Sequence, residues 1–286
     1  MPMTIDGAQT VPALVIEAPA QLASARIRLE SFDLRPLAGI VRIVGLDDAG
    51  PPITVALADE GSEAARRVSP WTAGVAIGSA SLIVLFPSRS PRYPHDTLED
   101  VLRHEVAHVM IGRAAGGNPV PRWFHEGLAM VVERPWGFED RSRLAWELAA
   151  GPRLTTREID ALFDGGQSAQ SRAYSLSAAV VRDIIREHGA ASPAGILRLV
   201  NANVGFDEAV ARVAGRPIAA VEVGFWDRQR VWTVWMPLVT SESVLWLAVV
   251  ALAALAVWRR RRRGAQIRRR WAEEERAAER TRAPPD

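Results

Sequence analysis

Two histidines four residues apart, with a glutamate between them, constrain the fold of this chain more than any other feature. The segment reads His104-Glu105-Val106-Ala107-His108. On an α-helix, positions i and i+4 lie on one face, so a helix is the conformation that lets both imidazoles reach one ligand. The opposite face of that helix would be apolar and face the core, since it carries Leu98, Leu102, Val106, Val109 and Met110.

The ends of this helix are also marked in the sequence. Residues 97–100 resemble a capping box, in which Thr97 caps the helix and Asp100 replaces the usual Glu or Gln. Gly112, followed by Gly116 and Gly117, marks the far end.

A second helix is predicted from residue 122 to residue 134, and it carries a glutamate, Glu126, eighteen residues after His108. Pro121 suits its first turn and Pro135 ends it. Its core face would hold Phe124, Leu128, Val131 and Val132, and its other face Trp123, Glu126, Met130 and Glu133. Glu126 would then point toward a neighbouring element. Gly127 beside it would let two helices approach closely.

Two imidazoles and a carboxylate are ligands that zinc accepts, and Glu105 would lie where it can take a proton from a water molecule beside the metal. Two alternatives stay open. His104 and His108 could be solvated surface histidines, and His125 could replace Glu126 as the third ligand.

Together, His104-Glu105-x-x-His108 and Trp123-x-x-Glu126-Gly127-Leu128-Ala129 resemble the gluzincins, the thermolysin-like zinc metallopeptidases, and especially their small peptidase MA-like domains. The resemblance covers about residues 11–230. It implies an α+β zincin-like fold with a small N-terminal sheet and a helical C-terminal half. It also implies that His104, His108 and Glu126 bind Zn²⁺ and that Glu105 is the general base and acid.

The sequence also departs from related patterns. Metzincins carry Gly and His three and six residues after the second histidine, where this chain has Ile111 and Ala114. Thermolysin-like enzymes often have an Asp four residues beyond the glutamate ligand to orient a histidine, and that position is Met130. Glu133 and Asp100 are the alternatives for this supporting hydrogen bond.

A peptidase also needs a donor for the oxyanion that forms when water attacks a carbonyl. Tyr174 is the candidate, because related domains often carry a Tyr near this position. Tyr93 is the second candidate, and an ordinary buried Tyr is the alternative for both. His95 and His188 are expected to have no catalytic role.

The order of the other predicted elements along the chain is consistent with this family. Strands are expected at residues 13–17, 53–58 and 80–86, and helices at 19–32 and 35–45. By resemblance, strand 80–86 would be the sheet edge above the zinc, where a peptide adds by backbone pairing; a fully buried strand is the alternative. Residues 87–95 would line the rim. Helices are expected at 156–163, 175–188, 193–201, 206–213 and 218–231.

Composition narrows the class of protein. The chain has 286 residues, of which 48% are hydrophobic, so it can bury a sizeable core. It has no cysteine, which excludes disulfides and thiolate zinc sites. Residues 259–286 hold eleven of the 35 basic and five of the 33 acidic residues, leaving 24 and 28, a net charge of −4, on the rest. A basic nucleic-acid-binding face is therefore not expected on the folded domain.

The C-terminal region predicts a membrane anchor. Residues 244–258 are uninterruptedly apolar, and extension back to Trp235 gives a helix, 235–258, long enough to span a bilayer. Five arginines follow directly, which predicts a cytoplasmic tail, 259–286, and a catalytic domain outside. A buried core helix is the alternative. Residues 1–10 contain no signal peptide, so we expect the native start to lie upstream. The alternative is a cytoplasmic domain whose tail departs from the positive-inside rule. Arginine without lysine favours a high-GC bacterium and its plasma membrane.

The sequence therefore predicts five regions: an N-terminal segment (1–10), a zincin N-terminal subdomain (11–150), a helical subdomain (151–230), the transmembrane helix and the tail. The expected function is that of a membrane-anchored zinc endopeptidase acting on protein or peptide substrates. The alternative is a membrane-tethered binding or scaffold protein with an inactive or structural zinc site.

Overall fold

A computed structural model describes residues 11–90, 95–133, 135–229, 246–247, 249–260 and 262. The chain divides into two compact units, Met1–Arg230 and Val231–Asp286. Both predicted subdomains, 11–150 and 151–230, lie in the first unit. The N-terminal segment 1–10, Tyr93, and most of the predicted tail lie outside the described residues.

The first unit is an α+β domain with a four-stranded sheet. The strands are β1 (Leu14–Glu17), β2 (Ile53–Leu57), β3 (Gly74–Ile77) and β4 (Leu82–Leu85), in the order β1-β2-β4-β3. β1, β2 and β4 run parallel, and β3 runs antiparallel to β4. The three predicted strands are confirmed, but β3 was not predicted. The edge strands are therefore β1 and β3, and the expectation that residues 80–86 form an edge is wrong, because β4 pairs with β2 on one side and with β3 on the other.

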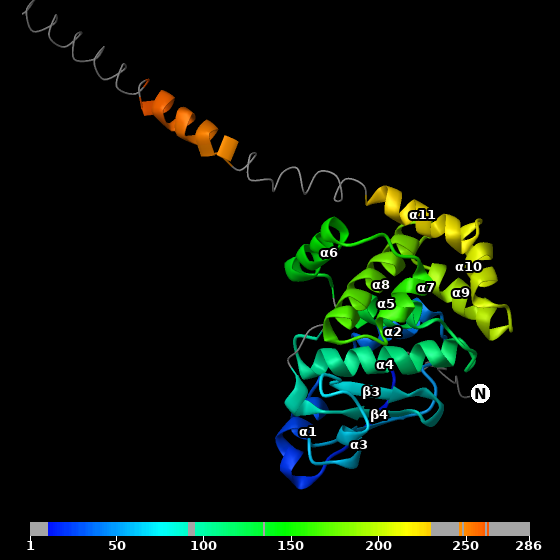
Figure 1. Cartoon of the computed structure of the whole chain (residues 1–286). Coiled ribbons are helices and arrows are strands. Elements are labelled where there is room, and N and C mark those ends of the chain that lie inside the picture. Colours follow the sequence, from blue (N-terminus) through cyan, green and yellow to red (C-terminus); the bar gives the residue numbers. More distant parts are fainter. Residues whose placement is uncertain are drawn as a thin grey trace, which may run out of the picture. The chain divides into compact units, whose positions relative to one another are not determined.

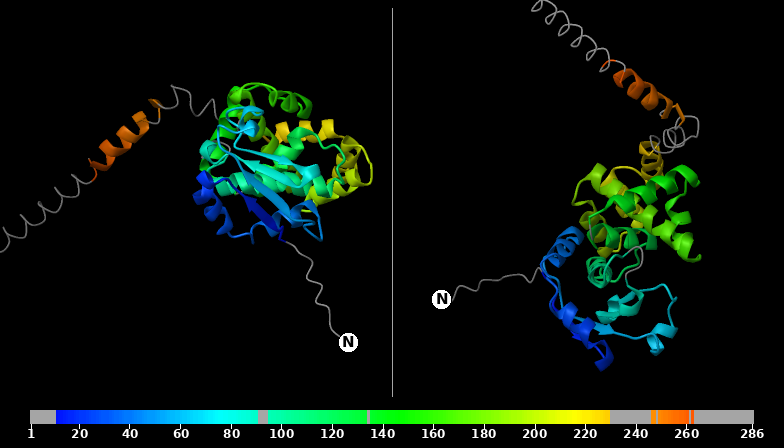
Figure 2. Two further views of the ribbon diagram at one scale, coloured as in Figure 1. Left: turned by 90° about the horizontal axis from the view of Figure 1, so that it is seen from below. Right: turned by 90° about the vertical axis from the view of Figure 1, so that its left-hand side faces the viewer.

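The sheet is covered by the first histidine helix, α4 (Leu98–Ala114), which contacts β3 and β4. Buried residues of the strands, among them Val55, Ile83 and Leu85, belong to the same apolar core as Val106 and Met110 of α4. Three short helices complete this half: α1 (Ala23–Glu30), α2 (Leu37–Val44) and α3 (Glu63–Arg66). Figures 1 and 2 show α4 between the sheet and the helices that follow α4 in the chain.

The second predicted helix, α5 (Arg122–Glu133), packs between α4 and the long helix α8 (Gln167–His188). A Cβ atom on Gly127 would lie 2.5 Å from the carbonyl oxygen of Ser177 in α8. The close approach predicted at Gly127 is therefore present, and α8 is the partner. Since α5 has a neighbour on each side, Trp123 and Met130 are buried as well as Phe124 and Leu128.

The remaining helices form the C-terminal half of the unit: α6 (Phe138–Ala150), α7 (Thr156–Leu162), α9 (Ser192–Asn201), α10 (Phe206–Ala214) and α11 (Ile218–Arg228). α6 was not predicted. α8 begins at Gln167 rather than at residue 175, so Tyr174 lies within this helix, two turns after its start.

In the second unit, residues 246–247 and 249–260 are helical, and their apolar side chains are exposed, Leu252 and Trp258 among them. No helix in the described part of the chain is both long and apolar enough to span a bilayer. Residues 235–245 and 248 of the predicted transmembrane helix lie outside the described residues.

Candidate metal centre

The start of α4 is fixed by the predicted cap. The Thr97 hydroxyl accepts a hydrogen bond from the Asp100 backbone N–H at 3.1 Å and donates to the Asp100 carboxylate at 2.7 Å. The other oxygen of Asp100 accepts from Arg103 at 2.7 Å. Asp100 is therefore occupied at the helix start and, of the two alternatives, does not support His104.

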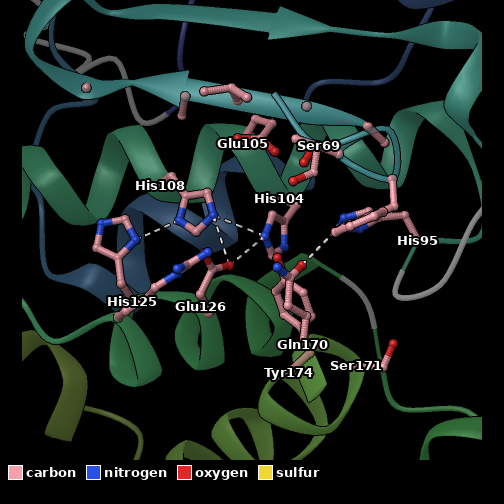
Figure 3. Close-up of a pocket in the computed structure, with 18 of the residues that line it drawn as sticks. Ser69, His95, His104, Glu105, His108, His125, Glu126, Gln170, Ser171 and Tyr174 are labelled. Carbon is pink, nitrogen blue, oxygen red and sulfur yellow. Dashed lines mark hydrogen bonds and ion pairs between the residues drawn. The ribbon is translucent and has the colours of Figure 1, made fainter. Parts of the chain in front are cut away.

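Three potential ligand atoms converge between α4 and α5. Nε2 of His104 lies 3.0 Å from Nε2 of His108, and each of these atoms lies 3.3 Å from Oε2 of Glu126. Figure 3 shows the three side chains pointing toward one another. The surface-histidine alternative is wrong, because His104 is 2% exposed and His108 is largely buried. These residues could hold a metal ion.

Glu133 holds the other side of His104. Its Oε2 lies 3.1 Å from Nδ1 of His104. A carboxylate accepts hydrogen bonds, so Nδ1 carries the proton and, in the neutral ring, Nε2 keeps its lone pair for a metal. Of the two predicted alternatives, Glu133 is therefore the residue that orients His104.

His95 also contacts this carboxylate, a contact that was not predicted from the sequence. Nδ1 of His95 lies 3.0 Å from Oε1 of Glu133, and the His95 and His104 rings meet edge to face with centroids 4.7 Å apart. His95, His104 and Glu133 form a second group whose atoms are close enough for a metal. Both oxygens of Glu133 already accept hydrogen bonds, one from His95 and one from His104. Hydrogen bonds therefore account for the close approach of these three side chains without a metal.

His125 meets His108 on the side away from the three converging atoms. The two Nδ1 atoms lie 2.7 Å apart and the rings stack at 4.6 Å. Burial, and then the nearby charge of His108, lower the pKa of His125 to about 3. Nδ1 of a neutral His125 can accept a hydrogen bond from the Nδ1–H of His108, which leaves the lone pair on Nε2 of His108 available for a metal. The geometry thus favours Glu126 over His125 as the third ligand.

The buried charges shift one another's pKa values. For His104, burial opposes the charge, but the hydrogen bonds to Glu126 and Glu133 outweigh it and raise the pKa to about 10. For Glu133, burial is outweighed by His95 and His104, which lower the pKa to about 2. The pKa of Glu126 is also held well below its ordinary value, since His108 and His104 outweigh burial. The pocket therefore favours a cation between His104, His108 and Glu126.

Glu105 lies beside these atoms on α4 and is only 4% exposed. Burial raises its pKa, against the opposing charges of His108 and His104. Gly74 of β3 lies directly against it, because a Cβ there would come within 2.7 Å of Cγ and Oε1 of Glu105. The carboxyl group is not among the converging ligand atoms, so it is free to accept a proton.

A cavity of about 500 Å³ joins these groups. It lies between residues 69–78 of the sheet side and α8, and His95, His104, Glu105, His108, Glu126 and Tyr174 line it. Tyr174 packs edge to face on Phe163, and burial together with Glu126 and Glu105 raises its pKa well above 10. The phenol therefore remains a hydrogen-bond donor beside the residues that could hold a metal ion. The five predicted site residues are brought together here.

A comparison of the chain with protein-family models and with curated proteins finds no match.

Proposed function

We propose that this chain is a zinc-dependent peptidase of the gluzincin type. One observation carries the proposal: the ligand atoms of His104, His108 and Glu126 converge within 3.3 Å of one another, and Glu105 lines the same cavity. The residues thus supply three metal ligands and a separate base, the minimum for hydrolysis by an activated water.

The ligand set fits zinc. A tetrahedral ion about 2.0–2.1 Å from each ligand requires ligand atoms roughly 3.3–3.4 Å apart. The observed separations are 3.0, 3.3 and 3.3 Å. Two neutral imidazoles and one carboxylate would supply three protein ligands, which is the number typical of catalytic rather than structural zinc. Bound zinc would act as a Lewis acid toward a substrate carbonyl and an attacking water.

The surrounding residues would divide the remaining tasks. Glu105 would accept the proton of the attacking water and pass it to the leaving nitrogen. Tyr174 would donate a hydrogen bond from its hydroxyl to the oxyanion that develops on the carbonyl.

A peptide is the favoured substrate because the cavity runs beside a sheet edge. β3 stands last in the strand order, and Gly74, Val75 and Ala76 line the cavity. An extended peptide can pair with the backbone of such an edge strand, with its side chains directed alternately up and down. This supports peptide hydrolysis over hydrolysis of a small ester or amide.

The substitution Glu105→Gln tests the activity. We expect the variant to keep zinc and fold but to lose hydrolysis of a peptide library, because an amide cannot take up the proton. Glu208→Gln on α10, where the carboxylate is exposed, is the matched control. Wild-type turnover in Glu105→Gln would remove Glu105 from the mechanism. If the wild type binds zinc but cleaves no peptide or protein, the binding or scaffold alternative replaces the peptidase.

We also propose that residues 235–258 anchor the peptidase in a bacterial plasma membrane, with the catalytic domain outside and the tail 259–286 in the cytoplasm. The support is the apolar run ended by five arginines. The exposed apolar side chains of helical residues 249–260 also suit contact with lipid. A C-terminal reporter active only in the cytoplasm, combined with proteolysis of intact spheroplasts, tests this topology. A protected catalytic domain would contradict it.

A further inference from the structure

A hydrogen bond crosses the cavity near the metal ligands. Trp71 lies in the loop before β3 and Gln170 lies on α8, and both side chains line the cavity from opposite sides. The indole Nε1–H of Trp71 donates to Oε1 of Gln170 at 2.9 Å, although the two residues are 99 positions apart. We refer to this pair, Trp71 and Gln170, as the cross-cavity bridge.

The Gln170 half of the bridge is held in one orientation. Its Nε2 donates to the carbonyl oxygens of Phe163 at 3.0 Å and Gly165 at 3.3 Å. Because the amide nitrogen is committed to two carbonyls, the amide oxygen has to face Trp71. Gln170 cannot swing aside without losing three hydrogen bonds.

The Trp71 half is held by a buried arginine. Nη1 of Arg89 donates to the carbonyl oxygens of Ser69 and Thr72, both at 3.0 Å, so the loop is held on each side of Trp71. Glu60 accepts from Nε of the same guanidinium at 2.8 Å and from Nη2 at 2.7 Å. Arg89 is 7% exposed, and charged hydrogen bonds of this kind are strong when buried. Both ends of the bridge are therefore anchored in the fold.

The bridge crosses the cavity close to the start of β3. Trp71 precedes Gly74, which touches Glu105, by three residues, and Gln170 precedes Tyr174 by one helical turn. Three residues of fully extended chain span about 10 Å, so Trp71 lies at most about this far along the chain from Gly74. In Figure 3, His125 lies at one end of the row of labelled residues and His95 at the other. Within the described residues, no hydrogen bond joins residues 74–81 to α5 or α8, so the His125 end has no matching bridge.

We propose that the cross-cavity bridge closes the cavity at its Trp71 end, so that this chain hydrolyses peptide bonds within about three residues of a chain terminus. Water adds across the C–N bond: its hydroxyl goes to the carbonyl carbon and its proton to the nitrogen, with no other reactant. This inference rests on the proposed peptidase function. It replaces the endopeptidase expected from the sequence with an enzyme that selects chain ends.

Two nested peptide series test the proposal with the zinc-loaded full chain. All peptides share one scissile bond; one series is lengthened only on the amino side and the other only on the carboxyl side. We expect kcat/KM to fall about tenfold or more in one series, once the lengthened side exceeds about three residues, and to stay level in the other. Mass spectrometry of the products verifies that the same bond is cut throughout.

Variants of the bridge should remove the length limit. Trp71→Ala is expected to raise the ratio of kcat/KM for long over short peptides about tenfold in the limited series. Trp71→Phe, which removes the donor but keeps most of the bulk, should raise it less. Trp146→Ala is the matched control, since Trp146 is 69% exposed on α6, and it should keep the wild-type ratio. Zinc content and circular dichroism establish that each variant is folded, and Gln170→Ala replaces Trp71→Ala if that variant does not fold.

The outcomes separate the two proposals. Equal kcat/KM at all lengths in both series would overturn the closed end, because the bridge would then open for every substrate, while the peptidase function would stand. An unchanged length limit in folded Trp71→Ala and Gln170→Ala would also overturn the role of the bridge. No zinc-dependent cleavage of any peptide would instead overturn the proposed function itself.

Discussion

Oε2 of Glu133 lies 3.1 Å from Nδ1 of His104. Glu133 lies seven residues beyond Glu126 on the same helix, α5. Seven residues are about two helical turns, so one face of α5 supplies both a potential ligand and the support of another ligand. We expect Glu133→Ala to weaken zinc binding about 10–100-fold, because His104 loses the acceptor that fixes its tautomer. Competition with a chelator measures this. Glu208→Ala should bind zinc like the wild type, and equal affinity in Glu133→Ala would refute the role.

The ligand set makes a second prediction. His104→Ala, His108→Ala and Glu126→Ala should each lose most of the zinc, because three protein ligands leave no redundancy. His125→Ala should still bind one zinc per chain, since its Nδ1 faces the far nitrogen of His108. Metal analysis of the purified variants decides whether Glu126 or His125 is the third ligand. Zinc retained in Glu126→Ala and lost in His125→Ala would exchange the roles of the two neighbours.

Gly74 allows a substitution that moves Glu105 without altering it. A Cβ at Gly74 would lie 2.7 Å from Glu105 and 2.9 Å from Val101, so Gly74→Ala should cost roughly 1–3 kcal/mol of stability and lower kcat. Gly39→Ala on α2 is the control. A Cβ there meets nothing within 4 Å, so this change should stabilise the protein by about 0.5–1 kcal/mol. Urea unfolding and turnover are the measurements; wild-type values for Gly74→Ala would contradict the contact.

Tyr174→Phe separates an oxyanion donor from a structural residue. We expect kcat to fall about tenfold or more with little change in KM, because the hydroxyl would act in the transition state. The ring contact with Phe163 should remain, so stability should change little. Loss of stability and activity in equal measure would mark Tyr174 as part of the core.

The metal-free protein should lose stability as pH rises. His104 has a folded pKa of about 10 against an ordinary 6.5, so its contribution is fully present below pH 6.5 and is lost toward pH 10. Glu133 has a folded pKa of about 2 against 4.5, so its contribution is present above pH 4.5 and lost toward pH 2. Stability should therefore be greatest between about pH 4.5 and 6.5.

Above pH 6.5, the loss of the proton from His104 should lower the free energy of unfolding by at most about 1.4 kcal/mol per pH unit. Urea unfolding of chelator-treated protein measures it, and His104→Ala should remove the dependence. Bound zinc should abolish the loss, since the ion replaces the proton. Stability that rises from pH 6.5 to pH 9 without metal would contradict the prediction.

The parts of the fold with local signals could be predicted from the sequence. α4 and α5 follow from helical periodicity, the Thr97 cap and the prolines beside α5. β3 was missed because it has only four residues and is defined by its pairing with β4, which no local pattern records. The length of α8 was underestimated because its first two turns are polar.

The candidate site, like the fold, could be predicted only where its residues lie in short local patterns. His104, Glu105, His108 and Glu126 share two short segments, so spacing alone brings them to notice. The bond between His95 and Glu133 joins residues 38 positions apart, and His95 lies outside any periodic element. Such contacts depend on how the loop before α4 packs against α5, which a single sequence does not express.

Gly74 lies against Glu105, which is 4% exposed and lines the cavity. A substrate that fills this cavity would separate Glu105 from bulk water. A proton accepted there could not exchange with the surroundings before the leaving nitrogen takes it up. In the proposed reaction, the proton that leaves the water would thus be the same proton that releases the amine.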